Sequence, residues 1–129
     1  MEKPQDNIYR SLAMMFLPGD LLNYFEVVNF KEEHTGREVM NGYPEKILHI
    51  YLDETERMRP SDSHRPNGFT EEKILKDFPI RDRQTVLHVR RRRWIDPDGH
   101  NEVMDYGELL GTSGTQMSRE FAAFLKDIP

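Results

Sequence analysis

The sequence predicts an α+β protein in which an N-terminal helical segment precedes antiparallel β-hairpins and an amphipathic helix closes the chain. Apolar residues follow a helical spacing near both ends of the chain, whereas they alternate with polar residues along its middle. Turn-forming residues separate the alternating runs. A length of 129 residues corresponds to about one domain, so we expect a single unit over residues 1–129.

Residues 1–25 are expected to form a helical lead-in. The apolar residues of its first helix recur three or four positions apart: Ile8, Leu12, Met15 and Phe16. Pro18 and Gly19 break this pattern. Asp20 then has the chemistry of a cap for a short second helix, which would carry Leu21, Leu22, Tyr24 and Phe25.

Residues 26–106 are expected to hold the hairpins. Two strand-like runs, Val27–Phe30 and Ile47–Leu52, predict a first hairpin with a long loop between its strands. In the second run the residues alternate in character, so Leu48, Ile50 and Leu52 would share one face. Residues 55–70 contain prolines and many charges, and we expect an exposed loop there.

Glu71–Ile80 is compatible with either a helix or a strand, and Pro79 decides between them. A proline disfavours helical geometry at the residue before it, which is Phe78, so we favour the strand. Thr85–Ile95 follows as the clearest strand in the chain, and the stretches Asp77–Arg81 and Val86–Trp94 lie close enough in the sequence to form the two arms of a hairpin. Asp96–Gly99 then has turn chemistry, and Glu102–Tyr106 is expected to return as its partner strand.

The closing helix is expected within residues 115–128, after a glycine-rich connection. Ser118 is a suitable N-cap for this helix. Five residues form its apolar stripe: Phe121, Ala122, Phe124, Leu125 and Ile128. Such a stripe ordinarily packs on a core, but Phe121, Phe124 and Leu125 are also candidates for docking on a partner.

Positive charge is concentrated in one short segment of an acidic protein. The net charge is −5, yet residues 81–93 contain six arginines and one aspartate, a local charge of +5. If the strand extends beyond the core, the guanidinium groups of Arg90–Arg93 fan into solvent. Each guanidinium can then bind a phosphate through two donors, with Arg81 and Arg83 flanking the contact. Trp94 would either stack on a base or close the local core.

The alternative for these arginines is pairing with the acidic flanks of the protein itself. Exposed ion pairs contribute only about 0.2–1 kcal/mol each. Adjacent like charges also repel one another unless an anionic partner lies across them. The segment therefore indicates nucleic-acid binding, although an acidic protein surface would satisfy the same charges.

Three stretches of residues resemble a known protein family. Asp77–Arg81, Val86–Val89 and Arg91–Trp94 resemble the N-terminal region of a bacterial insertion-sequence transposase family, in which this "N-region" is often a separate polypeptide. Leu21–Val27 is similar to the opening of that region, and Met117–Leu125 is similar to its closing helix. The resemblance implies double-stranded DNA of the transposon ends as partner and a catalytic transposase domain on a separate or missing segment.

The chain also departs from the family's pattern and lacks the usual signs of a metal or catalytic site. Related zinc-finger-bearing transposases place cysteines around this hairpin, and there are none here, which also indicates a reduced cytoplasmic location. The five histidines show no ligand spacing, and Asp96–Gly99 indicates a turn rather than a calcium loop. We therefore expect no metal, no cofactor, no enzymatic activity and no membrane span.

The sequence thus predicts a non-catalytic protein that contacts DNA through Arg81, Arg83, Arg90–Arg93 and Trp94. The alternatives are a protein-interaction module that docks on a catalytic partner or an acidic protein, and an inactive transposon remnant. The DNA target and the oligomeric state do not follow from these residues.

Overall fold

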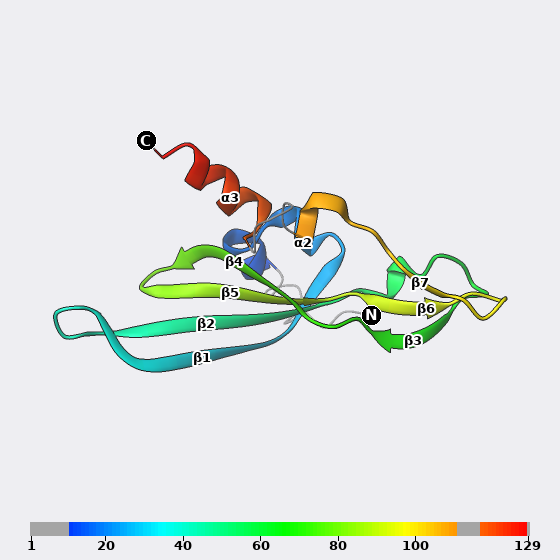
Figure 1. Ribbon diagram of the computed structural model, residues 1–129, viewed down its shortest axis with the longest axis horizontal. Helices are drawn as coiled ribbons and strands as arrows, with labels where there is room; N and C mark the ends of the chain where they lie inside the picture. The colour runs from blue at the N-terminus through cyan, green and yellow to red at the C-terminus, as the bar shows by residue number, and fades with distance from the viewer. Residues whose placement is uncertain (1–10, 111–116, 129) are drawn as a thin grey trace.

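The computed structural model describes residues 11–110 and 117–128 and places two β-sheets side by side along the long axis of the molecule (Figure 1). The first sheet has four strands in the order β1-β2-β5-β4, and the second has three in the order β3-β6-β7. The strands are β1 (Phe25–Met40), β2 (Tyr43–Glu54), β3 (Arg65–Phe69), β4 (Lys73–Ile80), β5 (Arg83–Arg90), β6 (Arg92–Ile95) and β7 (Asn101–Val103). The mixed α+β character expected from the sequence is confirmed.

Short helices accompany the sheets. They are α2 (Gly19–Leu22), η1 (Glu56–Met58), η2 (Gly107–Leu110) and α3 (Arg119–Lys126), with residues 11–16 also helical. Asp20 does not cap α2 as expected. The helix begins at Gly19, before Asp20, and Pro18 is its N-cap. None of the described helices combines the length and the apolar character needed to cross a bilayer.

Both hairpins of the first sheet were predicted, but their dimensions and their pairing were not. β1 and β2 are antiparallel and meet at Asn41-Gly42, so the strands are longer and the loop is shorter than expected. β4 pairs antiparallel with β5, which confirms a strand rather than a helix before Ile80. The two hairpins then join through a parallel pairing of β2 with β5, from Lys46↔Arg83 to Asp53↔Arg90.

The second sheet was predicted in part. β6 and β7 form the expected hairpin around Asp96–Gly99, where Asp96 Oδ1 accepts hydrogen bonds from the backbone N–H of Asp98 and of His100. The expectation of an exposed loop over residues 55–70 is wrong in part, because β3 pairs antiparallel with β6 there. Gly68 has a φ of 76°, which an L-residue adopts only at a cost, and it lies where the β3–β6 register shifts.

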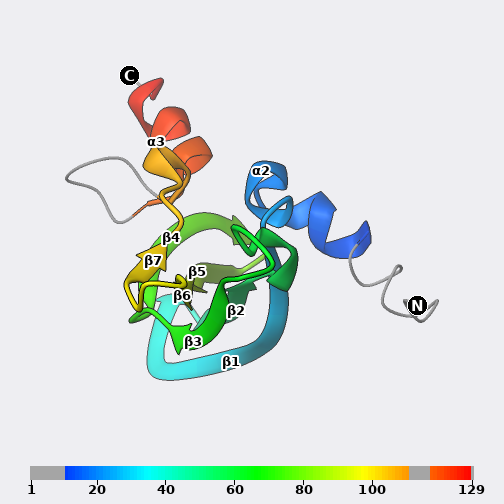
Figure 2. The same cartoon turned by 90° about the vertical axis from the view of Figure 1, so that its right-hand side faces the viewer.

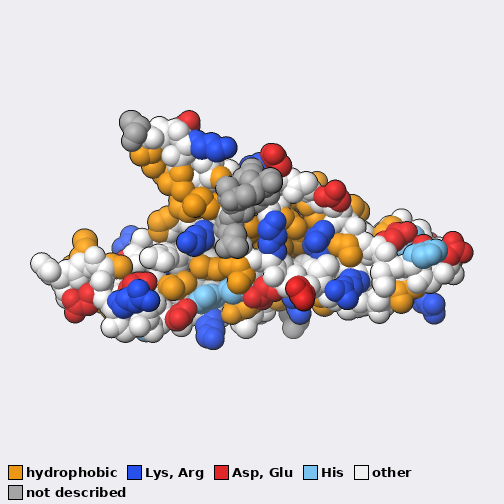
Figure 3. All heavy atoms as spheres, in the orientation of Figure 1, with side chains coloured by type: hydrophobic (Ala, Val, Ile, Leu, Met, Phe, Trp, Pro, Cys, Tyr) orange, Lys and Arg blue, Asp and Glu red, His pale blue; other side chains and the backbone are white. Residues whose placement is uncertain are grey.

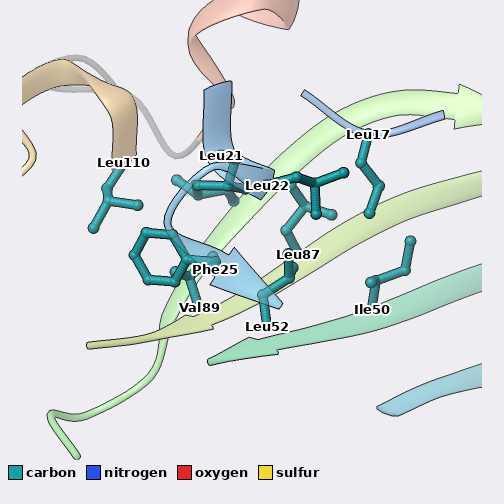
Figure 4. Packing of buried hydrophobic residues seen from close by; sticks show 10 residues of the cluster. Leu17, Leu21, Leu22, Phe25, Ile50, Leu52, Leu87, Val89 and Leu110 are labelled. Atoms are coloured by element: carbon teal, nitrogen blue, oxygen red, sulfur yellow. The ribbon is translucent and has the colours of Figure 1, made fainter. Parts of the chain in front are cut away.

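The core lies between one face of the four-stranded sheet and the helical segments (Figure 4). Its strand residues lie on β2, β4 and β5 and at the first position of β1, and its other members come from the segment before β1 and from η2. These residues are Leu17, Leu21, Leu22, Phe25, Ile50, Leu52, Leu75, Leu87, Val89 and Leu110. Each leucine or phenylalanine that is fully buried stabilises the fold by about 1.5–3 kcal/mol. Because the helices cover only this face, the opposite face of the sheet is left for polar side chains.

α3 attaches to the edge of this sheet through β4. The Ser118 hydroxyl donates to Asp77 Oδ1 (2.7 Å) and accepts from the N–H of Phe121, which confirms Ser118 as the N-cap. The Ser118 N–H donates to the Lys76 carbonyl (2.7 Å). Burial raises the pKa of the Asp77 carboxyl, although the Ser118 hydroxyl opposes that shift. Parts of two expected features lie outside the described residues: the start of the first helix, and residues 111–114 of the glycine-rich connection expected over 107–114.

Candidate nucleic-acid interface

The hairpin corner presents Arg81 to solvent and ties Arg83 to the protein. Arg81 is the first residue of a two-residue turn and has a φ of 61°. Arg83 donates through Nε to Glu32 on β1 and through Nη1 to Asp82 (3.2 Å). The pKa of Arg83 is raised by Glu32, while Arg83 lowers the pKa of the Glu32 carboxyl. Arg81 is therefore the available cation at this corner.

The arginine run does not fan into solvent as expected. Arg90 forms a two-pronged pair with Asp53, with Nε–Oδ1 and Nη2–Oδ2 distances of 2.8 and 2.7 Å, and this bond raises the pKa of Arg90. Arg92 donates through Nε to the carbonyl of Glu54 (2.7 Å). Both guanidinium groups also lie over the ring of Phe69, at 4.2 and 4.9 Å from its centre.

Arg91 and Trp94 are likewise held by the protein. Arg91 donates through Nη1 to the Met104 carbonyl (3.2 Å), and its backbone leaves the first sheet to enter the second. Trp94 is 1% exposed and lies under the guanidinium of Arg59 at 5.3 Å, so it closes a local core and cannot stack on a base. The arm fails to project because its strand crosses between two sheets, where each side chain except that of Arg93 meets an acceptor or an aromatic ring.

Buried Glu54 anchors this crossing. Its side chain is 0% exposed, and Oε1 accepts the backbone N–H of Arg92 (2.8 Å) while Oε2 accepts the hydroxyl of Tyr106. Burial and this contact raise the pKa of the Tyr106 hydroxyl. The carboxylate therefore fixes the backbone of the arginine run rather than neutralising an arginine side chain.

Arg93 points the other way, onto a face of the second sheet that the described residues leave uncovered. In the register of this sheet Arg65 lies opposite Ile95, Ile95 opposite Asn101, and Arg93 opposite Val103. The side chains of Asn67 and Asn101 are joined across the same face by a 2.7 Å hydrogen bond. We call this surface the arginine face; it consists of Arg65, Asn67, Arg93, Ile95, Asn101 and Val103.

The arginine face carries positive charge without a counter-charge. Arg65 and Arg93 are both exposed, and their side chains form no hydrogen bond or ion pair with any other described residue. Among the described residues no acidic residue is paired across this face, because Glu102 lies opposite Trp94 and bonds to His64 on the other side of the sheet. Diagonal neighbours on adjacent strands lie about 7–8 Å apart, so the two guanidinium groups can engage one extended anionic ligand. Figure 2 looks toward the end of the molecule that carries this sheet.

Sequence reasoning identified Arg93 but missed Arg65. Arg65 was placed in an exposed loop, and Pro66 and Gly68 beside it concealed the strand. In the sequence Arg93 looks like Arg90, Arg91 and Arg92, and it differs from them only in the side of the sheet to which its side chain points. That direction depends on β6 pairing on both edges, which no local pattern reveals.

Two of the five histidines are paired with each other, although the spacing of the histidines in the sequence gave no sign of such a pair. His49 on β2 and His88 on β5 are hydrogen-bonded to each other, because the parallel pairing brings them to the same face of the first sheet. His49 is also hydrogen-bonded to Glu33, and His88 to Glu72. The ligand atoms of Asp96, Asp98 and His100 also lie close together, but the cluster is exposed and belongs to a hairpin turn.

The three candidate docking residues of α3 differ in their environments. Phe121 and Phe124 both pack against Phe78 of β4, with ring centres 5.0 and 5.3 Å apart. Phe124 nevertheless remains 51% exposed and Leu125 37% exposed. One side of the stripe thus secures α3 to the sheet, and the other side is open.

Comparisons of this chain with protein-family models, with curated proteins and with solved structures gave no match. Any function must therefore be argued from the geometry of the site and from the resemblance of the motif residues.

Proposed function

We propose that this protein is the non-catalytic, DNA-binding N-terminal part of a bacterial insertion-sequence transposase. In this proposal the arginine face contacts the phosphates of double-stranded DNA at the transposon ends, and the protein acts in the cytoplasm. The observation that carries the proposal is the pair of exposed guanidinium groups, Arg65 and Arg93, on a sheet face where the described part of the chain places no carboxylate. The resemblance of Asp77–Trp94 to a transposase N-region supports the choice of DNA.

The proposal assigns different roles to the arginines of the run. Arg93 binds phosphate together with Arg65, whereas Arg90, Arg91 and Arg92 hold the backbone that presents them. Arg81 lies on the β4–β5 turn, towards the opposite end of the long axis from β6 (Figure 1). Arg81 can therefore contact DNA only at a site separate from the one that the arginine face contacts, and only on a long duplex. The two aligned asparagines, Asn67 and Asn101, add uncharged hydrogen-bonding groups beside the guanidinium groups.

Charge also limits the expected affinity. A net charge of −5 opposes the approach of any polyanion, so binding depends on a local surface rather than on the overall field. Two phosphate contacts release few counterions, and we therefore expect weak binding with a modest dependence on salt.

The test is fluorescence anisotropy with a labelled duplex of mixed sequence at low salt. The double variant Arg65→Ala/Arg93→Ala should lose most of the affinity, while Arg37→Ala should keep it. Arg37 is a matched control because it is an exposed arginine on β1, whose side chain has no partner among the described residues. Equal binding by the wild type and the double variant would remove the arginine face from the proposal.

The transposon part of the proposal has its own test. A catalytic transposase domain should be encoded next to this gene, and duplexes from the ends of that element should bind more tightly than the mixed-sequence duplex. Equal affinity for both duplexes would leave a non-specific DNA-binding protein and contradict the assignment to transposon ends.

A second candidate is docking on that catalytic domain through α3. The observation that favours it is the open side of the helix, where Phe124 and Leu125 are 51% and 37% exposed, together with Ile128 just beyond the helix end, which is 52% exposed. Co-purification with the catalytic domain that survives nuclease treatment, and that Leu125→Asp abolishes, would support direct docking. Loss of the complex on nuclease treatment would show that DNA bridges the two proteins.

A further inference from the structure

His49 and His88 point their ring nitrogens at each other across two neighbouring strands. His49 Nδ1 lies 2.7 Å from His88 Nε2, and the ring centres are 5.0 Å apart. The parallel register places Tyr51 beside His88, and the two rings stack at 4.4 Å with only 16° between their planes. This stacking fixes the orientation of the His88 ring.

The outer nitrogens of both rings are held by carboxylates. His49 Nε2 lies 2.7 Å from Glu33 Oε1, and His88 Nδ1 lies 2.7 Å from Glu72 Oε1. An ionised carboxylate only accepts hydrogen bonds, so each outer nitrogen carries the hydrogen and donates it. A neutral imidazole has one donor and one acceptor nitrogen, so the two inner nitrogens are both left with a lone pair. Two lone pairs facing each other at 2.7 Å require a cation between them.

The same arrangement is characteristic of histidines that bind metal ions. A histidine ligand usually donates its second N–H to a carboxylate, which fixes the tautomer and strengthens the nitrogen that faces the metal. Here both histidines are supported in this way, from β1 in one case and from the segment before β4 in the other. The two carboxylates also offset the charge of a divalent ion.

We propose that His49 and His88 bind one divalent transition-metal ion between His49 Nδ1 and His88 Nε2. Without the metal, these two nitrogens are hydrogen-bonded to each other at 2.7 Å. Imidazole nitrogen suits Zn²⁺, Cu²⁺ and Ni²⁺, and Cu²⁺ binds most tightly of the three to a site of a given kind. Zinc–nitrogen bonds of about 2.0–2.1 Å in tetrahedral geometry require the two nitrogens to separate to about 3.3 Å. A small rotation of the His49 side chain, which is 18% exposed, supplies that movement.

The histidine pair lies next to a groove that borders His88 but not His49. A groove of about 290 Å³ runs along the polar face of the first sheet beside His88, and Tyr51, Glu72 and Arg90 line it. Figure 3 shows histidine side chains at the surface over the middle of this sheet, with acidic side chains next to them. Two protein ligands leave open positions at the metal, which water molecules would fill.

The cluster at Asp96, Asp98 and His100 provides an internal control. Its ligand atoms lie within 4.8 Å of one another, but Asp96 Oδ1 already accepts two backbone hydrogen bonds that close the turn. We assign the metal to the histidine pair and expect the turn to contribute nothing measurable.

The test is calorimetric titration of the full chain with Cu²⁺ and with Zn²⁺, together with electron paramagnetic resonance of the Cu²⁺ form. We expect one ion per chain, and nitrogen hyperfine structure from two imidazoles in the wild-type spectrum. His49→Ala and His88→Ala should each weaken binding at least tenfold, whereas His100→Ala should not. Glu33→Gln and Glu72→Gln, which act through the rings, should weaken binding by about 10–100-fold and leave the two nitrogens in the spectrum.

Two results would overturn the proposal. The first is a wild-type protein that does not bind Cu²⁺ at micromolar concentration, or whose spectrum shows fewer than two nitrogens. This result comes from the wild type alone and does not depend on whether any variant folds. The second is binding that survives His49→Ala and His88→Ala but is lost in His100→Ala, which would place the ion at the β6–β7 turn. Circular dichroism of each variant separates loss of the site from loss of the fold.

Discussion

Replacing Arg90 with alanine removes interactions that join three strands. The guanidinium donates two hydrogen bonds to Asp53 of β2 and lies 4.2 Å from the ring centre of Phe69 on β3. Asp53 is itself buried, with 8% of its surface exposed. The variant therefore leaves a buried carboxylate without its partner, which costs more than the loss of an exposed ion pair.

The size of the effect follows from these contacts. Hydrogen bonds to charged groups contribute about 1.5–3 kcal/mol, and a cation–π contact contributes about 0.5–1 kcal/mol at an exposed site. Because the Arg90 side chain is 42% exposed, solvent screens part of this interaction. We therefore expect Arg90→Ala to lower the free energy of unfolding by about 2 kcal/mol, a large share of the stability of a small domain.

Urea denaturation followed by tryptophan fluorescence measures this loss, because Trp94 is the only tryptophan and is buried. With a typical m-value of about 2 kcal/mol/M, the midpoint should fall by about 1 M. Arg90→Lys keeps the positive charge but not the two-pronged guanidinium geometry. Its urea midpoint should therefore lie between those of the wild type and Arg90→Ala. A double-mutant cycle with Asp53→Ala should give a coupling of about 1 kcal/mol or more. A midpoint equal to that of the wild type would refute the structural role of Arg90.

Two further predictions concern β4 and its turn. Burial raises the folded-state pKa of Asp77 above its unfolded value, so the native protein binds the proton more tightly and the free energy of unfolding falls as pH rises between these two values. Asp77→Asn keeps a hydrogen-bond acceptor for Ser118 and should be more stable than the wild type at neutral pH. The difference in the free energy of unfolding should shrink as pH falls. A difference that grows on acidification would contradict this. Arg81→Gly should raise the urea midpoint by an amount equivalent to about 0.5 kcal/mol, because glycine tolerates the φ of 61°. A lower midpoint would instead indicate that the Arg81 side chain stabilises the turn.

Local sequence patterns predicted the elements better than their partners. Pro79 was sufficient to identify β4 as a strand, and Ser118 was sufficient to mark the start of α3. The parallel pairing of β2 with β5 was not predictable in this way, because hairpin signals connect only neighbouring segments. β3 was missed because a five-residue strand with a proline and a glycine resembles a loop.

The candidate site shows the same division. A run of arginines indicates a basic surface, but which members of the run face solvent depends on acceptors far away in sequence. Asp53 lies 37 positions from Arg90, and the Glu54 carbonyl lies 38 positions from Arg92. The histidine pair likewise joins residues 39 positions apart. These contacts follow from the sheet order, which a single sequence does not specify.

The salt dependence of DNA binding tests the central claim most directly. Each phosphate contact contributes about 0.9 to the slope of log K against log salt concentration for duplex DNA. The wild type should therefore show a slope about 1.8 steeper than Arg65→Ala/Arg93→Ala, and Arg37→Ala should match the wild type. Equal slopes and affinities in all three proteins would contradict a DNA contact through the arginine face.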